Sequence, residues 1–248
     1  MSANVLEKTV PPRPIAAHER LIVALDVSNA KAARELVSRI GGNAGMYKVG
    51  LQLFVAEGPE LVRELVDAGQ RVFLDLKLHD IPNTVSHAVK SAVDSGASLL
   101  TVHAAAGGDS LRAAIDAAAG RLAILGVTVL TSFDDEDLRE TGVPTDVAKQ
   151  VVHLASLAKA AGCAGVVTSP RETALVRKLI GPRMAIVNPG IRPLGSGKDD
   201  QERTATPAEA ILAGASHIVV GRPITQAEDP ARAAAKIVLE MEQAQSSR

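Results

Sequence analysis

The sequence alternates short apolar runs with longer segments of helical spacing, and this alternation limits the fold more than any other feature. In the longer segments, apolar residues recur at intervals of three and four with charged residues between them. The pattern is typical of strands followed by helices that cover a parallel sheet. The expected strands are residues 21–26, 46–50, 71–77, 98–104, 122–130, 164–169, 184–190 and 216–222. The expected helices are residues 30–40, 57–68, 82–94, 110–119, 145–160, 171–180, 207–213 and 230–243.

Eight strands that alternate with eight helices predict an α/β fold, namely a single (β/α)8 barrel, also called a TIM barrel. The 248 residues agree with the roughly 250 that such a barrel needs. A doubly wound open sheet is the alternative, but it gathers polar residues at one switch point, whereas here they end nearly every strand. Only 2% of residues are aromatic although 46% are hydrophobic, so the core must consist of Ala, Val, Leu and Ile.

Residues 1–17 are expected to form a flexible leader, and residues 18–248 the barrel domain. The leader contains three prolines and has no apolar signal-peptide core. No uncharged stretch approaches the ~18 residues of a membrane span. The single cysteine, Cys163, is expected to pack as a small buried hydrophobic residue in a reducing compartment. We therefore expect a soluble, cytoplasmic protein.

The charges of the chain are balanced, with 27 Lys and Arg against 28 Asp and Glu. Such a balance argues against a general surface for nucleic acid or for a membrane, and we expect neither partner. Any anionic ligand must then be held by a local site.

The stretch FLDLKLHDIPNT, residues 73–84, carries the charges that packing explains least. Under a strand period of two, Asp75 and Lys77 share one face, and apolar side chains share the other. Asp80 follows where the strand ends. Burying unpaired charge is costly or shifts the pKa, so we interpret two acids and a lysine at one strand end as functional.

Two later strand ends predict a phosphate site. The segments NPGIR and VVGRP each supply a glycine that lets backbone N–H groups approach an anion, and an arginine, Arg192 or Arg222, that can pair with phosphate oxygens. The loops after the seventh and eighth strands commonly hold phosphate in a barrel. The long loop from Pro193 to Arg203 contains two glycines and is expected to close over a ligand.

A metal site formed by Asp75, His79 and Asp80 is the chemical alternative, because carboxylates and imidazole bind divalent cations. Lys77 shares the face of Asp75, and its positive charge opposes such a cation. We therefore expect neither a metal nor another cofactor. His79 is expected to pack behind the site, and whether His103 lines the site is left open.

The motif DLKLHDIPNT closely resembles the signature of the orotidine 5′-phosphate decarboxylase family, specifically its bacterial branch. The resemblance extends from LIVALD to GRPI, and it is more specific than an Asp-x-Lys-x-x-Asp core, which related sugar-phosphate barrels share. The supporting segments are ALD at 24–26, YKVG at 47–50, TVLTS at 128–132, PGIRP at 189–193, DDQ at 199–201 and VVGRPI at 219–224.

The resemblance implies a homodimeric carboxy-lyase that converts orotidine 5′-phosphate to UMP, the last step of de novo pyrimidine synthesis, without a cofactor. Lys77 would donate a proton to C6 between Asp75 and Asp80, and Asp80 would reach into the partner's site. The other residues implied in substrate binding are Asp26 and Lys48 at the ribose, Thr131 at the pyrimidine, Arg192, Gln201, Gly221 and Arg222 at the phosphate, and Ile81 and Thr84 beside Asp80.

Some positions depart from the family pattern, and two other functions compete. Phe133 stands where an aliphatic residue is expected, and HAAAGG at 103–108 has alanine where relatives have Ser or Gly. A hexulose-phosphate synthase or keto-sugar-phosphate decarboxylase would stabilise an enediolate with Mg²⁺, but the long loop and the additional lysine argue against it. A non-catalytic nucleotide sensor is the other alternative, although a pure binder does not need an ammonium group beside two acids.

Overall fold

The computed structural model describes residues 15–193 and 204–246, and within them eight parallel strands close into a barrel. Each strand pairs with the next in chain order, and β8 pairs with β1. The predicted (β/α)8 barrel is therefore confirmed, and the open sheet is wrong. The strands are β1 (Leu21–Ala24), β2 (Met46–Gly50), β3 (Val72–Leu78), β4 (Leu99–His103), β5 (Ala123–Val127), β6 (Gly165–Val167), β7 (Ala185–Asn188) and β8 (His217–Val220).

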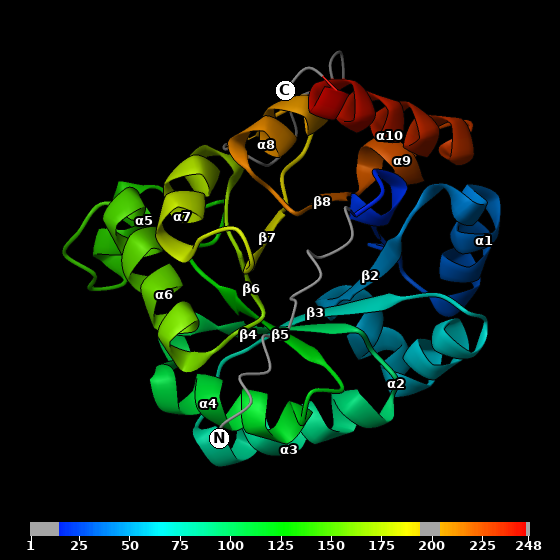
Figure 1. Ribbon diagram of the computed structural model, residues 1–248. Helices are drawn as coiled ribbons and strands as arrows, with labels where there is room; N and C mark the ends of the chain where they lie inside the picture. Colours follow the sequence, from blue (N-terminus) through cyan, green and yellow to red (C-terminus); the bar gives the residue numbers. More distant parts are fainter. Residues whose placement is uncertain (1–14, 194–203, 247–248) are drawn as a thin grey trace, which may run out of the picture.

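Helices surround the strands on the outside of the barrel (Figure 1). The α-helices are α1 (Ala30–Ile40), α2 (Leu51–Asp67), α3 (Pro82–Asp94), α4 (Gly108–Ala118), α5 (Asp135–Glu140), α6 (Val147–Ala161), α7 (Thr173–Ile180), α8 (Pro207–Ala213), α9 (Arg222–Thr225) and α10 (Pro230–Ser246). Short 3-10 helices are η1 (His18–Arg20), η2 (Gly41–Asn43), η3 (Ala104–Ala106) and η4 (Pro170–Glu172).

Three helices differ from the sequence prediction. The acidic segment FDDEDLRE, expected as a loop, contains α5. The side chain of Asp134 caps the first turn of this helix, and the carboxylate of Asp137 accepts a hydrogen bond from the backbone N–H of Asp134. The short helix α9 follows β8 directly. Helix α2 begins at Leu51 because it consists of two helical parts that join at Gly58, where φ is 69°, just before Pro59.

The apolar residues of the barrel form two layers. One fills the barrel interior, and the other packs the strands against the helices. In β3, for example, Phe73 belongs to the inner layer and Leu74 to the outer one. The inner layer consists of Ile22, Ala24, Met46, Phe73, Leu125, Val127, Val167, Val187 and Val219. Charged side chains that share this interior face therefore need partners within it.

The pairing of β3 with β4 changes register near the carboxyl end of β3. Leu74 pairs with Leu100, but Leu78 pairs with Val102, so three residues of β3 lie opposite a single residue of β4. Such a bulge bends a strand and redirects its side chains. Lys77 lies within the bulge with a φ of 51°, which is rare for a residue other than glycine. The regular period of two predicted for this strand therefore ends before Lys77.

Cys163 packs in the outer apolar layer, as predicted. Burial raises the pKa of its thiol to about 11, so the thiol is protonated and unreactive at neutral pH.

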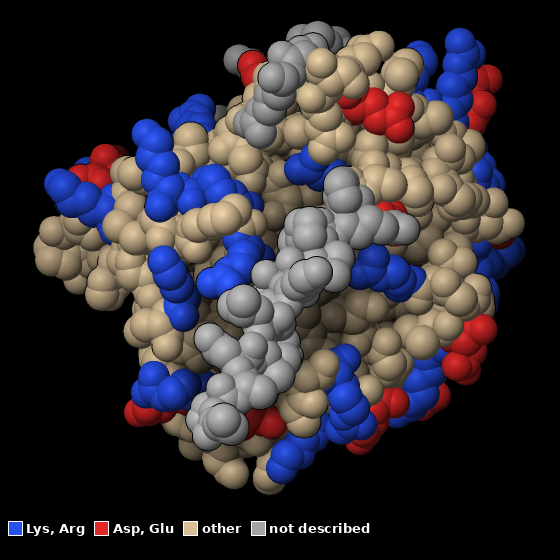
Figure 2. Space-filling view, in the orientation of Figure 1, with Lys and Arg blue, Asp and Glu red and all other residues tan. Residues whose placement is uncertain are grey.

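The surface carries charges of both signs. On the face seen in Figure 2, acidic and basic side chains are interspersed, and several basic ones border the middle of the face. Among the described residues, no helix is both long enough and apolar enough to cross a bilayer.

Candidate active site

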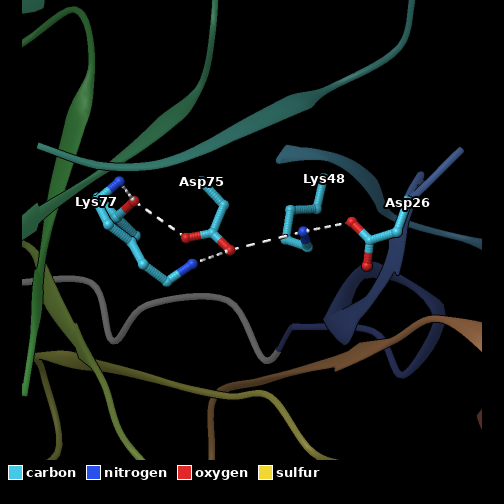
Figure 3. Close-up of polar contacts among 5 residues, drawn as sticks. Asp26, Lys48, Asp75 and Lys77 are labelled. Atoms are coloured by element: carbon cyan, nitrogen blue, oxygen red, sulfur yellow. Dashed lines mark hydrogen bonds and ion pairs between the residues drawn. The ribbon is translucent and has the colours of Figure 1, made fainter. Parts of the chain in front are cut away.

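Four charged side chains form a row at the carboxyl ends of β1, β2 and β3 (Figure 3). The Nζ atom of Lys77 lies 2.8 Å from Oδ2 of Asp75. The same Oδ2 lies 3.6 Å from Nζ of Lys48, which donates a hydrogen bond of 3.0 Å to Oδ1 of Asp26. Ammonium and carboxylate groups alternate, so the row as a whole carries no net charge.

Neighbouring strands bring these four residues together from distant parts of the sequence. Ala24 of β1 lies opposite Lys48 of β2, and Gly50 of β2 lies opposite Asp75 of β3. Gly50 also leaves space for the row, since a Cβ atom there would lie 2.7 Å from Nζ of Lys48 and 3.3 Å from Oδ1 of Asp26. The row therefore depends on the order of the strands and on glycine, which has no side chain, at position 50.

Asp75 is charged despite its burial. Burial by itself would raise the pKa of this carboxyl group, but the ammonium groups of Lys48 and Lys77 and the hydrogen bonds from Lys77 and Thr101 outweigh it. The pKa of Asp75 is therefore held below its usual range. Lys48 is itself buried, so its ammonium group depends on Asp26 and Asp75 for compensation.

A cavity of about 160 Å³ lies beside the row. Lys48, Asp75 and Lys77 form a charged part of its wall, and most of the remaining wall is apolar. The other lining residues are Phe73, Val127, Val129, Leu130, Thr131, Val167, Thr168, Pro189 and Val219. Of this second group, the sequence prediction named only Thr131. The apolar members carried one signal, namely their position near the ends of strands expected to form a barrel.

Thr101 of β4 is a further residue of the site that the sequence prediction missed. Its buried hydroxyl accepts a hydrogen bond of 2.9 Å from the backbone N–H of Lys77 and donates one of 3.1 Å to Oδ1 of Asp75. A hydroxyl within the apolar run LLTVH was a detectable signal. Its partners were not, because the bulge that presents the Lys77 N–H to Thr101 leaves no mark in the sequence.

Two histidines lie near the charged row. The ring centroids of His79 and His103 are 5.3 Å apart, and the ring planes are inclined by 37°. Burial lowers the pKa of His103, the charges of His79 and Lys77 lower it further, and Asp75 opposes them. His103 is therefore neutral at physiological pH. It adjoins the row, although it is not among the residues that line the cavity.

The loop after β7 was predicted to bind phosphate. Gly190 has a φ of 77°, a conformation that favours glycine. Beyond it, Ile191 and Ala205 form a parallel bridge, and the backbone N–H of Arg192 donates to the carbonyl oxygen of Ala205 at 2.9 Å. This bridge fixes the backbone that carries the half-buried Arg192 at the start of the long loop. Gln201 lies outside the described residues.

The loop after β8 lies close to the charged row. Gly221 precedes α9, and a Cβ atom added to it would lie 3.8 Å from Oδ2 of Asp26. Arg222 follows and is exposed. The structure therefore places one of the two predicted phosphate loops beside the Asp26 end of the row.

Asp80, Ile81 and Thr84 were predicted to complete the site of a second subunit, and in this single chain they lie outside the described cavity lining. All three are exposed between the end of β3 and the first turn of α3, and Ile81 is 66% exposed. Oδ1 of Asp80 accepts a hydrogen bond of 2.7 Å from the backbone N–H of Ile81. None of the three belongs to the described lining of the cavity.

The alternative prediction was a metal site formed by Asp75, His79 and Asp80. Within residues 15–193 and 204–246, His, Cys, Asp and Glu side chains form no group of three that could hold a metal ion. The oxygens of Asp75 already face two ammonium groups and the Thr101 hydroxyl. The site is therefore arranged around paired ammonium groups.

A barrel with a charged row and a cavity at the carboxyl ends of its strands is the arrangement of a (β/α)8-barrel enzyme. Comparison with known families defines the kind of enzyme. The chain belongs to the orotidine 5′-phosphate decarboxylase / HUMPS family, whose model matches residues 19–237.

Similar proteins cover nearly the whole chain. Orotidine 5′-phosphate decarboxylase of Rhodopseudomonas palustris (strain HaA2) is 52% identical over 227 residues, which are 91% of this chain and 96% of the relative. The protein of that name from Moorella thermoacetica is 49% identical over 91% of this chain and 93% of its own length. The crystal structure of orotidine 5′-phosphate decarboxylase from Lactobacillus acidophilus matches with a TM-score of 0.81 and 38% identity, covering 89% of this chain and 98% of that one.

Proposed function

We propose that this chain decarboxylates orotidine 5′-phosphate to UMP, the last step of de novo pyrimidine nucleotide synthesis. Relatives at about half identity bear the name of this activity. The structural observation that carries the proposal is the 2.8 Å ion pair between Lys77 and Asp75 beside the cavity. A protein that merely binds a nucleotide does not need an ammonium group held in this way.

Decarboxylation leaves an electron pair at C6, in the plane of the pyrimidine ring. No adjacent π-system can delocalise this pair, so a fixed positive charge beside C6 must stabilise it. The ammonium group of Lys77 supplies that charge and then transfers a proton to C6, which completes UMP. In this direct mechanism the reaction requires neither a metal nor an organic cofactor.

Asp75 fixes the direction of the Lys77 ammonium group. An ammonium group has three N–H donors, and one of them is directed at Asp75. The Lys77 side chain is 30% exposed, which leaves the other donors accessible to a substrate in the cavity. The same ion pair compensates the positive charge of Lys77 in this partly buried position.

Asp26 and Lys48 bind the ribose hydroxyls. Oδ1 of Asp26 accepts from Lys48, while the side chain is 56% exposed and can accept a substrate hydroxyl. Because Gly221 lies beside Asp26, a ribose held here would direct its phosphate toward the loop after β8. This order of contacts supports a nucleotide that extends from the cavity to the phosphate loops.

The phosphate is held by Arg192, Gln201, Gly221 and Arg222, and Thr131 lies against the pyrimidine. Arginine pairs and backbone N–H groups suit a phosphate dianion, since the hydrogen bonds are charge-assisted. Phosphate is remote from C6, so its binding energy can contribute to lowering the barrier. The predicted closing loop after Pro193 lies outside the described residues.

The active enzyme is a homodimer in which Asp80, together with Ile81 and Thr84, completes the site of the other subunit. The exposure of all three residues supports this role, because they are free to contact a second chain. Ile81 is also 66% exposed, and burying its apolar surface in an interface would favour association of the two subunits.

Loss of absorbance as orotidine 5′-phosphate is decarboxylated, measured in EDTA-treated buffer, tests the proposal. The wild-type chain is expected to turn over, and Lys77→Ala is expected to lower kcat by roughly 10³-fold or more, since it removes both the charge and the proton donor. Lys31→Ala is the control, because Lys31 is an exposed residue of α1 that pairs with Glu35.

Other outcomes separate the competing functions. The absence of turnover by pure, folded, chelated protein would contradict the proposal. Tight UMP binding without turnover would indicate a sensor. Activity on a keto-sugar phosphate that requires added Mg²⁺ would indicate the enediolate chemistry.

A further inference from the structure

The bulge in β3 removes backbone partners at the place where the proposed proton donor lies. Between the pairs Leu74–Leu100 and Leu78–Val102, β3 has three residues and β4 has only Thr101. A regular ladder cannot continue through such a segment, so its backbone N–H groups need other acceptors.

Lys77 is held in an unfavourable backbone conformation within this bulge. Its φ of 51° lies in the left-handed region, where the Cβ atom of a residue other than glycine is crowded. Such a conformation persists only when surrounding contacts hold it, and it is common where a side chain must be aimed at a substrate.

The Thr101 hydroxyl provides contacts of this kind. It accepts from the N–H of Lys77 at 2.9 Å, and its single proton goes to Oδ1 of Asp75 at 3.1 Å. The hydroxyl thus uses its one donor and one of its acceptor positions, in a residue that is fully buried. With Oδ1 engaged by Thr101, Oδ2 of Asp75 faces the ammonium groups of Lys77 and Lys48.

We propose that Thr101 is a positioning residue for the decarboxylation: its hydroxyl couples the Lys77 backbone to the Asp75 carboxylate and so directs the Lys77 ammonium group into the cavity. This inference rests on the proposed function, because it assigns to Thr101 an effect on the orientation of the proton donor. Thr101 itself does not line the described cavity.

Substitution of Thr101 separates this role from a purely structural one. Thr101→Val keeps the shape but leaves the Lys77 N–H and Oδ1 of Asp75 without this partner, whereas Thr101→Ser keeps the hydroxyl. Thr128→Val is the matched control. Thr128 is buried and directly follows β5, the strand next to β4, and its hydroxyl donates a hydrogen bond of 2.9 Å to the backbone oxygen of Val167. All variants are studied as the full chain, by kinetics, thermal unfolding and UMP binding.

Thr101→Val is expected to lower kcat by roughly 10²-fold, the loss typical of a misplaced catalytic group, with KM and UMP affinity changed less than threefold. Thr101→Ser is expected to retain kcat within about fivefold, and Thr128→Val to retain it fully even if its Tm falls as far as that of Thr101→Val. The acid limb of the kcat profile is expected to move to higher pH in Thr101→Val, because the lost hydrogen bond helped to keep Asp75 charged.

An active wild-type chain with unchanged kcat in Thr101→Val would overturn the inference, as would equal losses of kcat in Thr101→Val and Thr128→Val. An inactive wild-type chain would instead contradict the proposed function. Hydrogen exchange of the Lys77 amide tests the contact without any turnover, since exchange is expected to be faster in Thr101→Val and unchanged in Thr128→Val. Unchanged exchange in both would contradict the coupling.

Discussion

The carboxylate of Asp75 keeps two ammonium groups together in a partly buried site, since it lies 2.8 Å from Lys77 and 3.6 Å from Lys48. Asp75→Asn preserves the shape but leaves these two positive groups to repel each other. We expect kcat to fall by roughly 10²-fold or more, because the ammonium group of Lys77 loses its fixed position. Steady-state kinetics measure this, and Asp109→Asn, which changes an exposed partner of Arg112, should leave kcat unchanged. Wild-type kcat in Asp75→Asn would contradict the role of this carboxylate.

The buried imidazole of His217 makes the free energy of unfolding depend on pH. Burial, together with the charges of Arg20 and Arg71, lowers its pKa to about 4, and Glu19 opposes them. Its Nδ1 atom is buried and has no hydrogen-bond partner in the described part of the chain. Histidine in an unfolded chain has a pKa of about 6.5, so the unfolded state binds the proton first as the pH falls. The contribution of neutral His217 is therefore complete above about pH 6.5 and is lost toward pH 4.

The expected loss is about 2–3 kcal/mol in the free energy of unfolding between pH 7 and pH 4.5. Urea unfolding at the two pH values measures it, and His217→Asn should reduce the difference by a similar amount. His153→Asn serves as the control because His153 is exposed on α6. If both variants show the wild-type difference, His217 does not titrate as inferred.

The junction between β2 and α2 shows how one glycine shapes the site. Gly50 has a φ of −94°, so its backbone would accept alanine, but the new Cβ atom would lie 2.7 Å from Nζ of Lys48. Gly50→Ala is expected to displace this ammonium group and to raise KM by roughly tenfold, because hydrogen bonds to charged groups contribute that much. Kinetics and thermal unfolding separate the effects, since Tm should change little. Gly42→Ala is the matched control, as a Cβ atom there meets nothing within 4 Å.

The order of strands and helices could be predicted from the sequence because each element repeats a simple pattern. Apolar runs alternate with amphipathic segments, and chain order alone brings the ends of β1, β2 and β3 together. The meeting of Asp26 with Lys48 is a consequence of that order. The bulge in β3 could not be predicted, because the left-handed conformation of Lys77 contradicts its local preference and is held by tertiary contacts with Thr101. The early start of α2 was missed because Gly58 and Pro59 resemble a helix boundary.

In the barrel as a whole, the residues that stabilise the fold and the residues of the candidate site occupy different regions. The inner layer below the site is apolar, and the charged row and the cavity lie where the strands end. A second set of residues, Asp80 to Thr84, is exposed on the surface of the single chain. Their position beside β3 but outside the cavity is the feature that a second subunit would explain.

Mixing two inactive variants tests whether two subunits share each site. In a heterodimer of Lys77→Ala and Asp80→Ala chains, one site lacks both residues, while the other combines wild-type Lys77 with wild-type Asp80 of the neighbouring subunit. Random mixing makes half of the dimers heterodimers, so about a quarter of wild-type activity should return. If Asp80 acted within its own chain, neither site would be intact and no activity would return. Heterodimers isolated with two different affinity tags have one intact site of two, so their turnover should be about half that of the wild type. Each variant mixed with itself is the control. Confirmed heterodimers that stay inactive would show that Asp80 does not complete the other subunit's site.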